Sequence, residues 1–334
     1  MLPESTIIDQ LAALRTRSPL QKNRVHETDA EIIEVGGQLF ALTTDTLFEE
    51  LDRGLIIDPY ATGWISVLMS LSDLSAVGAT PVGILLGLNL PKEISKDRVK
   101  LICKGIEDCC RKHQTFILGG DTNHTDKLSI STTALGKFEG TKYLGRTPLI
   151  HDSPLYVSGT VGTGNLAAFL NINNQGKDRL LLRKEAQIEL GKLLLKFDGK
   201  AIDTSDGLLF TLTHLFSINE VGFSLDASLF PYAPPAPEIL KETGLTCEIL
   251  ALGEVGDYEL LFTVPGDRRV TFEEETKKRN LKVTLIGKTT DKKEITINSK
   301  LLDLQALKTE LDRASNNEEY LRIIVGEIST WSEM

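Results

Sequence analysis

Hydrophobic and polar positions follow two different periods along this chain of 334 residues, and the changes of period predict its elements. Residues 39–44 form an apolar run that ends in two threonines, which is typical of a buried strand. Residues 60–77 begin after an Asp-Pro pair and end before a glycine, and this pattern predicts a helix. Residues 96–113 place apolar side chains at helical spacing, so we expect an amphipathic helix there.

The same patterns continue through the rest of the chain and indicate an α/β protein. Strands are predicted at 82–90, 115–118, 128–135, 155–158, 201–202, 222–225, 259–264 and 282–286, and helices from 163, at 208–219 and at 271–279. Glycine and proline interrupt the pattern between Gly145 and Pro154. We therefore expect two α/β (α+β) domains, an N-terminal one at 1–150 and a C-terminal one at 151–334.

Composition limits the classes of function. Hydrophobic residues make up 41% and charged residues 25% of the chain, which is typical of soluble globular proteins. No apolar stretch is long enough to cross a membrane and the N-terminus has no signal-peptide pattern, so we expect a cytoplasmic protein without membrane association. The net charge of −10 and the lack of a basic tract argue against nucleic-acid binding. An acidic protein can still bind a phosphorylated small molecule when divalent metal ions supply positive charge.

Four cysteines occur without the spacing of a metal finger. Cys103, Cys109 and Cys110 lie in the predicted helix at 96–113, and Cys247 stands apart. We expect Cys103 and Cys110 on the apolar face of that helix, as buried thiols rather than ligands. Free thiols fit a reducing cytosolic compartment.

Aspartates recur at strand ends and inside one helix. Asp45 follows Thr43 and Thr44, and this row of oxygens suits a hard cation such as Mg²⁺, although a simple hydroxyl turn would use the same residues. Asp73 lies among leucines in the helix at 60–77, where a carboxylate is costly unless it is paired or metal-bound. The alternative places Asp73 on an exposed side of the helix, near Ser70 and Ser66.

Two further acidic segments combine carboxylates with small residues. Gly119 and Gly120 precede Asp121, so the backbone could approach a phosphate while the carboxylate holds a metal; a plain turn is the alternative. Residues 203–207, Asp-Thr-Ser-Asp-Gly, lie between a strand and a helix. That position suits ligand binding in α/β sheets, but Ser205 or Asp206 could equally cap the helix.

The chain has no Walker loop and no correctly ordered GxGxxG motif that would bind nucleotide in another way. Residues 159–164 are rich in glycine, but their order does not match a dinucleotide loop. We interpret them as a tight strand–helix turn. The aspartates together therefore predict a metal-assisted phosphate site.

The ordered set of these segments resembles the thiamine-monophosphate kinases over residues 25 to 265. This family belongs to a superfamily with aminoimidazole ribonucleotide synthetase, selenophosphate synthetase and the hydrogenase maturation dehydratase. The segments that carry the resemblance are Thr-Asp-Thr-Leu at 44–47, Leu-Ser-Asp-Leu at 71–74, Gly-Gly-Asp-Thr at 119–122, Ile-Asp-Thr-Ser-Asp-Gly-Leu at 202–208 and Asp-Tyr-Glu-Leu at 257–260.

The resemblance implies an aminoimidazole ribonucleotide synthetase-like fold of two domains, whose N-terminal domain contributes strands to a barrel shared within a homodimer. It implies in-line transfer of the γ-phosphoryl group of ATP to the phosphate of thiamine monophosphate, assisted by Mg²⁺. Carried over by position, the metal shell comprises Asp29, Thr43, Thr44, Asp45, Asp73, Asp121, Asp203 and Asp206. The implied nucleotide contacts are Gly120, Asp121, Arg146 and Ser205, and the implied catalytic residues are Asp45, Asp121 and Asp206.

This sequence departs from the family pattern mainly on the acceptor side. Three segments carry other residues: Thr28 replaces the first carboxylate of Gly-Asp-Asp, Gly256 stands at a glutamate position, and Lys184-Glu185-Ala186-Gln187 replaces Pro-x-Pro-Arg. Two features are absent from the sequence. There is no histidine near Asp52 and no Gly-Trp motif near residue 300, since Trp331 lies in the tail. Two alternatives therefore stay open. One is a related phosphotransferase or ligase for another small phosphate or carboxylate, and the other is a catalytically silent nucleotide-binding paralogue.

Overall fold

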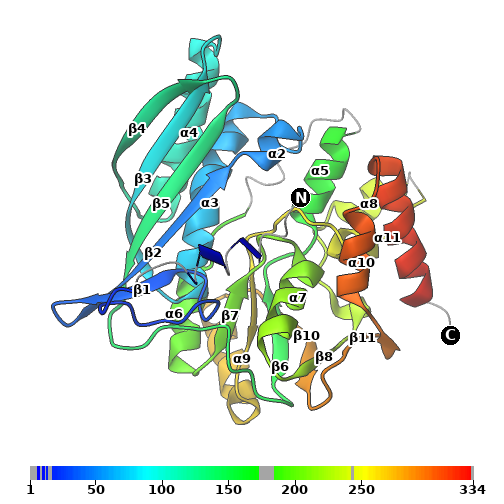
Figure 1. Ribbon diagram of the computed structural model, residues 1–334. Coiled ribbons are helices and arrows are strands. Elements are labelled where there is room, and N and C mark those ends of the chain that lie inside the picture. Colours follow the sequence, from blue (N-terminus) through cyan, green and yellow to red (C-terminus); the bar gives the residue numbers. More distant parts are fainter. Residues whose placement is uncertain are drawn as a thin grey trace.

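The computed structural model describes residues 17–172, 184–241 and 244–331, together with residues 6, 7, 10, 11 and 13. Two sheets organise these residues, one in each half of the chain (Figure 1). The first has the order β1-β2-β5-β3-β4, and the second has the order β12-β11-β8-β10-β6-β9-β7. The predicted boundary at residue 150 falls in the connection between the last strand of the first sheet and the first strand of the second.

The N-terminal sheet is mostly antiparallel, and only the β3–β4 pair within it is parallel. The elements of this half are β1 (Glu31–Val35), β2 (Gln38–Leu47), α2 (Glu49–Asp52), α3 (Pro59–Ala76), β3 (Thr80–Pro91), α4 (Lys96–Lys112), β4 (Ile117–Thr125) and β5 (Ser129–Lys137). Helices α3 and α4 pack on each other, and α3 lies against the sheet (Figure 1).

Helix α3 is buried on nearly all sides because it also packs against α6 of the C-terminal half. Its N-terminus is capped by Asp58, whose carboxylate accepts hydrogen bonds from the backbone N–H groups of Tyr60 and Ala61 at 2.8 and 3.0 Å. Ser66 and Ser70 are fully buried. The side of the helix near these serines is therefore not exposed, which rules out the surface interpretation of Asp73.

Strand β4 forms one edge of the N-terminal sheet and is exposed along almost its whole length. It runs through Gly119, Gly120 and Asp121, so the predicted short strand ending in a turn is wrong: pairing with β3 continues to Thr125. A side chain at Gly120 would place its Cβ 2.0 Å from the carbonyl oxygen of Leu86. The glycine therefore permits close strand pairing rather than a turn.

The C-terminal half surrounds its own sheet with helices. Its elements are β6 (Pro154–Ser158), α5 (Thr163–Ile172), α6 (Ile188–Lys196), β7 (Lys200–Asp203), α7 (Leu208–Ile218), β8 (Gly222–Leu225), α8 (Ala236–Lys241), β9 (Leu260–Thr263), α9 (Arg269–Lys278), β10 (Val283–Thr290), β11 (Ile295–Ile297), β12 (Lys300–Leu301), α10 (Leu304–Leu311) and α11 (Asn317–Trp331). Trp331 is buried in the core of this half.

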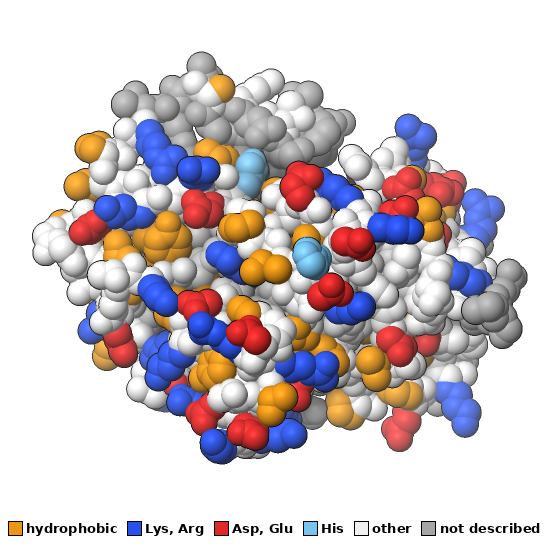
Figure 2. All heavy atoms as spheres, turned by 90° about the horizontal axis from the view of Figure 1, so that it is seen from below, with side chains coloured by type: hydrophobic (Ala, Val, Ile, Leu, Met, Phe, Trp, Pro, Cys, Tyr) orange, Lys and Arg blue, Asp and Glu red, His pale blue; other side chains and the backbone are white. Residues whose placement is uncertain are grey.

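Acidic and basic side chains are interspersed over the face seen from below (Figure 2). No helix in the described part of the chain is long and apolar enough to cross a membrane. The cysteines are free. Cys110 is buried, as predicted, but Cys103 is exposed, contrary to the prediction, and Cys109 is buried in its place.

Candidate functional site

Three of the predicted acidic residues converge where the two halves of the chain meet. Asp29 precedes β1, Asp73 lies in α3, and Asp203 ends β7. Each contributes a carboxylate oxygen to a group whose atoms all lie within 4.8 Å of one another. Three charged carboxylates so close together repel strongly in a buried site, so a bound cation or protonation has to offset their charge.

Strand β2 supports this acid cluster, which we define as Asp29, Asp73 and Asp203. The hydroxyl of Thr43 donates a hydrogen bond to Asp73 Oδ2 at 2.5 Å. Asp45, two residues along the same face of the strand, accepts a hydrogen bond from Ser70 Oγ of α3 at 2.7 Å. The alternating period of the strand thus directs Thr43 and Asp45 toward α3.

Burial and mutual repulsion raise the pKa values of these carboxyl groups. Burial raises the pKa of Asp73 well above its usual value, and the charges of Asp45, Asp203 and Asp29 raise it further. Burial, followed by the charge of Asp29, raises the pKa of Asp203 to about 8. The pKa of Asp45 is also raised, mainly by burial. A divalent cation would remove this repulsion.

The cluster has oxygen atoms to offer such a cation. Asp29 Oδ2 and Asp203 Oδ2 are buried and have no hydrogen-bond partner among the described residues. The other carboxylate oxygen of Asp29 forms an ion pair with Arg146. Buried, unpaired carboxylate oxygens beside a threonine hydroxyl are a donor set that fits a hard cation such as Mg²⁺.

The turn after β7 carries two more predicted residues at the surface of the site. Ser205 and Asp206 are exposed, and Ser205 Oγ donates a hydrogen bond to Asp203 Oδ1 at 3.1 Å. Asp206 lies outside the acid cluster. Its charge raises the pKa of Glu50 in α2, where burial is the main cause. Asp206 therefore lies near α2.

Other predicted residues lie away from the cluster. The side chain of Thr44 is on the exposed face of the sheet, where its hydroxyl lies 3.0 Å from that of Thr133. Asp121 is exposed on β4 and accepts a hydrogen bond from Asn123 Nδ2 at 2.9 Å. Three strand spacings, about 14 Å, separate β4 from β2 in the same sheet. Gly120 and Asp121 therefore do not join the acid cluster of their own chain.

Two residues of the site had no role assigned to them from the sequence. Ser70 holds Asp45, and His214 Nε2 lies 3.2 Å from the guanidinium of Arg146. Ser70 precedes Asp73 by one helical turn, and a second polar residue at that spacing in an apolar helix was an available signal. His214 lies in α7 and had no comparable signal.

Several positions that depart from the family pattern have defined contacts in the structure. A side chain at Gly256 would place its Cβ 2.3 Å from the carbonyl oxygen of Ser205, so a glutamate does not fit there. Asp52 forms an ion pair with Lys127 at 2.6 Å, and Glu254 forms one with Lys308 at 2.8 Å. The hydroxyl of buried Thr28 donates to the carbonyl oxygen of Ala30.

The glycine-rich segment at 159–164 is a strand–helix turn, as predicted, between β6 and α5. Its backbone N–H groups bind a carboxylate of the protein itself. Asp257 accepts hydrogen bonds from Gly162 N at 2.5 Å and from Gly164 N at 3.0 Å. This turn is therefore occupied by an internal anion.

Comparisons with known proteins agree with this fold. Residues 27–138 match the family AIR synthase related protein, N-terminal domain. The chain thus has the fold of the AIR synthase-related proteins. The fold also resembles that of the hydrogenase maturation protein HypE from Escherichia coli, at 20% identity and a TM-score of 0.65 over 90% of this chain and 97% of HypE.

Closer relatives identify the family. The chain is 31% identical to the thiamine-monophosphate kinase of Haemophilus influenzae, over 75% of this chain and 78% of that protein. The solved thiamine-monophosphate kinase of Stenotrophomonas maltophilia matches with 27% identity and a TM-score of 0.71, over 90% of this chain and 98% of that one. AaThiL, solved in complex with AMPPCP and TMP, matches with 24% identity and a TM-score of 0.73, over 90% and 94% of the two chains. The protein belongs to the thiamine-monophosphate kinase family.

Proposed function

We propose that this protein is a kinase that transfers the γ-phosphoryl group of ATP to thiamine monophosphate, giving thiamine diphosphate and ADP. The observation that carries the proposal is the convergence of Asp29, Asp73 and Asp203, in a chain of this family, with carboxylate oxygens left without partners among the described residues. A phosphate-transfer enzyme needs such a site because ATP reacts as a metal complex.

Mg²⁺ fits the donor set of the cluster. Asp29, Asp73 and Asp203 would hold it, with Asp45 and Thr43 beside them. When bound, Mg²⁺ supplies positive charge that offsets the negative charge of the transferring phosphoryl group. The protein's own residues bind the substrates and orient them. Arg146 offers a guanidinium that can grip a phosphate oxygen, and Ser205 offers a hydroxyl at the edge of the site.

The reaction needs no protein nucleophile. A phosphate oxygen of thiamine monophosphate forms the new P–O bond to the γ-phosphorus, while the bond from that phosphorus to the β–γ bridging oxygen breaks and ADP leaves. The acceptor oxygen is already ionised at neutral pH, so no strong general base is required. Asp45 and Asp206 contribute by fixing charge and position, and the rate then depends on alignment of the two substrates.

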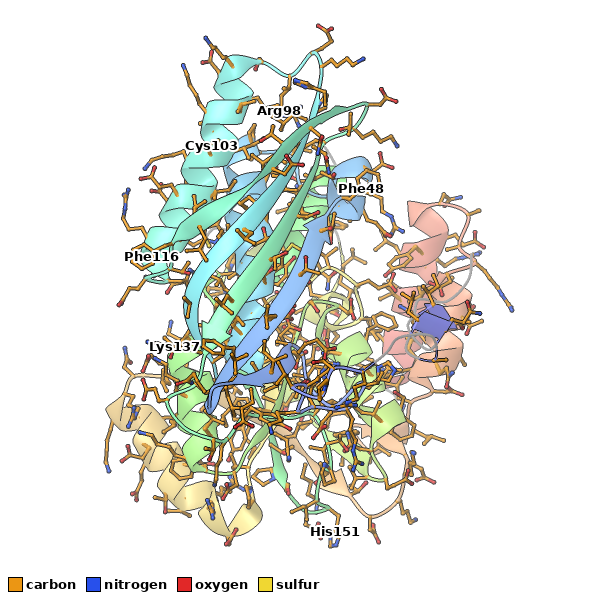
Figure 3. The ribbon with its side chains drawn as sticks, turned by 60° about the vertical axis from the view of Figure 1, so that its left-hand side comes forward. Phe48, Arg98, Cys103, Phe116, Lys137 and His151 are labelled. Carbon is orange, nitrogen blue, oxygen red and sulfur yellow. The ribbon has the colours of Figure 1, made fainter. Side chains whose placement is uncertain are left out.

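We also infer that Gly120 and Asp121 act in a homodimer. The edge strand β4 is exposed, and Phe116, Leu118 and Leu85 are 68%, 55% and 47% exposed (Figure 3 labels Phe116). An exposed apolar edge strand favours pairing with another chain. A second copy joined at this edge would cover these side chains and bring Asp121 toward a neighbouring site, which its own chain does not do.

The test of the proposed function is a product assay with ATP, MgCl₂ and thiamine monophosphate. We expect ADP and thiamine diphosphate in equal amounts. ADP without thiamine diphosphate would show a working ATP site that uses another acceptor. ATP binding without either product would favour a catalytically silent member of the family.

A further inference from the structure

Lys184 is a charged residue in the interior of the protein, outside the acid cluster. Its side chain is 4% exposed, and Asp257 and Glu259 beside it are 2% and 5% exposed. Among the described lysines it is the one that is buried. A buried ammonium group is costly unless its charge is offset and its N–H groups are bonded, so its surroundings have to be specific.

Residues of the C-terminal half offset the charge of the Lys184 ammonium group and accept hydrogen bonds from it. It donates hydrogen bonds to the carbonyl oxygen of Thr160 at 2.5 Å and to Glu259 Oε1 at 3.1 Å. Asp257 Oδ1 lies 3.5 Å from it. The lysine thus joins the turn after β6 to the segment that leads into β9.

The backbone around Lys184 contacts the N-terminal half instead. Trp64 Nε1 in α3 donates a hydrogen bond to the carbonyl oxygen of Lys184 at 3.1 Å. Ala186 N donates to His113 Nε2, just after α4, at 2.9 Å. One short segment therefore binds both halves of the molecule, and on the N-terminal side it holds the helix that carries Asp73.

The carboxylates bound by Lys184 belong to the segment that fixes the turn after β7. Asp257 N donates to the carbonyl oxygen of Thr204 at 3.0 Å, and Glu259 N donates to Thr204 Oγ1 at 3.0 Å. Thr204 N in turn donates to the carbonyl oxygen of Glu259 at 2.8 Å. Thr204 directly follows Asp203, so these bonds set the position of the Asp203 carboxylate.

We propose that Lys184 is a positioning residue that holds Asp203 at the correct distance from Asp73 across the junction of the two halves. It acts through Asp257, Glu259 and Thr204 on one side and through Trp64 and α3 on the other. The inference rests on the proposed cation site. It assigns a role to a position where this chain departs from the family pattern.

The test measures cation affinity apart from turnover. Lys184→Met keeps the length of the side chain but removes its charge and donors. Trp64→Phe keeps an aromatic ring but removes the N–H that binds Lys184. For each variant, binding of AMPPCP is titrated with MgCl₂ by calorimetry, and unfolding by urea is recorded. We expect both variants to raise the half-saturating Mg²⁺ concentration about tenfold, the lower end of the range for residues that orient metal ligands.

Thr289→Val is the matched control for a purely structural effect. Thr289 is fully buried, and its hydroxyl donates to the carbonyl oxygen of Ile150 at 2.6 Å, far along the chain from the acid cluster. We expect this variant to lose stability with its Mg²⁺ half-saturation unchanged. An unchanged Mg²⁺ half-saturation in Trp64→Phe, or in a folded Lys184→Met, would overturn the proposal. Absence of thiamine diphosphate in the product assay would count against the proposed function alone, since the titration needs no turnover.

Discussion

The guanidinium of Arg146 forms an ion pair with the carboxylate of Asp29, and these side chains are only 17% and 1% exposed. Arg146 also donates toward His214 Nε2, which must therefore be an acceptor and neutral. Burial, with the charge of Arg146, lowers the pKa of His214 to about 4, in agreement with this role. One oxygen of Asp29 thus binds a permanent cation of the protein, and the other, Oδ2, is buried without a hydrogen-bond partner among the described residues.

Removing the arginine is predicted to destabilise the fold as well as the ATP site. In Arg146→Ala, Asp29 remains buried without its partner, and we expect the free energy of unfolding to fall by about 3 kcal/mol. Urea denaturation measures this change, and calorimetry measures the expected weaker binding of ATP. Arg146→Lys keeps the charge and serves as the control. Equal stability of Arg146→Ala and the natural protein would contradict the interpretation of this pair.

Neutralising Asp73 is predicted to raise the stability of the protein without divalent cations and to lower its kinase activity. Asparagine can still accept the hydrogen bond from Thr43, but it removes one charge from a group of mutually repelling acids. Without divalent cations, we expect the unfolding temperature of Asp73→Asn to rise by about 2–4 °C. Kinase activity should fall about 10²–10³-fold, as when one electrostatic contact to a transition state is lost. A lower unfolding temperature in EDTA would refute the repulsion argument.

A side chain at Gly256 is predicted to disrupt the site rather than restore the family pattern. In Gly256→Ala the new Cβ would collide with the Ser205 carbonyl oxygen, and we expect a loss of about 1–3 kcal/mol from overpacking. Thiamine diphosphate formation should fall with it, because the turn carrying Ser205 and Asp206 has to shift. Gly140→Ala, where no atom lies within 4 Å of the added Cβ, is the control and should be neutral.

His113 is predicted to make stability depend on pH. Its Nε2 accepts from Ala186 N, and its Nδ1 lies 2.9 Å from the carbonyl oxygen of Cys109, an arrangement that requires the neutral ring. Burial lowers its pKa in the folded state. The unfolded state therefore binds a proton first, and stability is lost as the pH falls below about 6.5. We expect His113→Gln to reduce the change of the unfolding temperature between pH 7 and pH 5. An unchanged dependence of the unfolding temperature on pH would exclude this role.

The exposed edge at β4 predicts a dimer that one charge can disrupt. Phe116→Glu should convert the protein to a monomer in light-scattering measurements, because burying the new carboxylate in an interface is unfavourable. Val270→Glu is a matched control, since Val270 and Phe116 are both 68% exposed but lie in different halves of the chain. A dimer that persists in Phe116→Glu would place the interface elsewhere.

Long periodic elements could be predicted from the sequence, and α3 and α4 lie within one residue of their predicted ends. The error at Gly119 and Gly120 arose because a glycine pair indicates a turn locally, whereas pairing with β3 extends the strand. Cys103 was misplaced because helical spacing alone does not say which edge of an apolar face meets the neighbouring helix. Short elements such as β1, α2 and β12 had too few residues to show a period.

The aspartates taken together predicted a metal-assisted phosphate site, although Asp45, Asp73, Asp121 and the segment at 203–207 each had an ordinary alternative alone. The place of Asp29 in the metal shell was implied only by the resemblance. The convergence of the acid cluster depends on contacts between residues far apart in the chain, which no local rule contains. The same applies to the ion pair of Arg146 with Asp29, 117 positions apart, and to the hydrogen bond of Lys184 with Glu259, 75 positions apart. Long-range polar contacts of this kind are visible only in the folded structure.

The carboxylate of Asp121 projects from a strand whose backbone is paired with β3 at Gly87. Its location is fixed when the sheet forms, before any other molecule arrives. A group that meets this carboxylate has no loop to order, so little conformational entropy is lost on contact. Binding of another molecule at this edge should therefore be fast and should not change the conformation of the strand. Changes in the loops that flank the strand should have little effect on this binding.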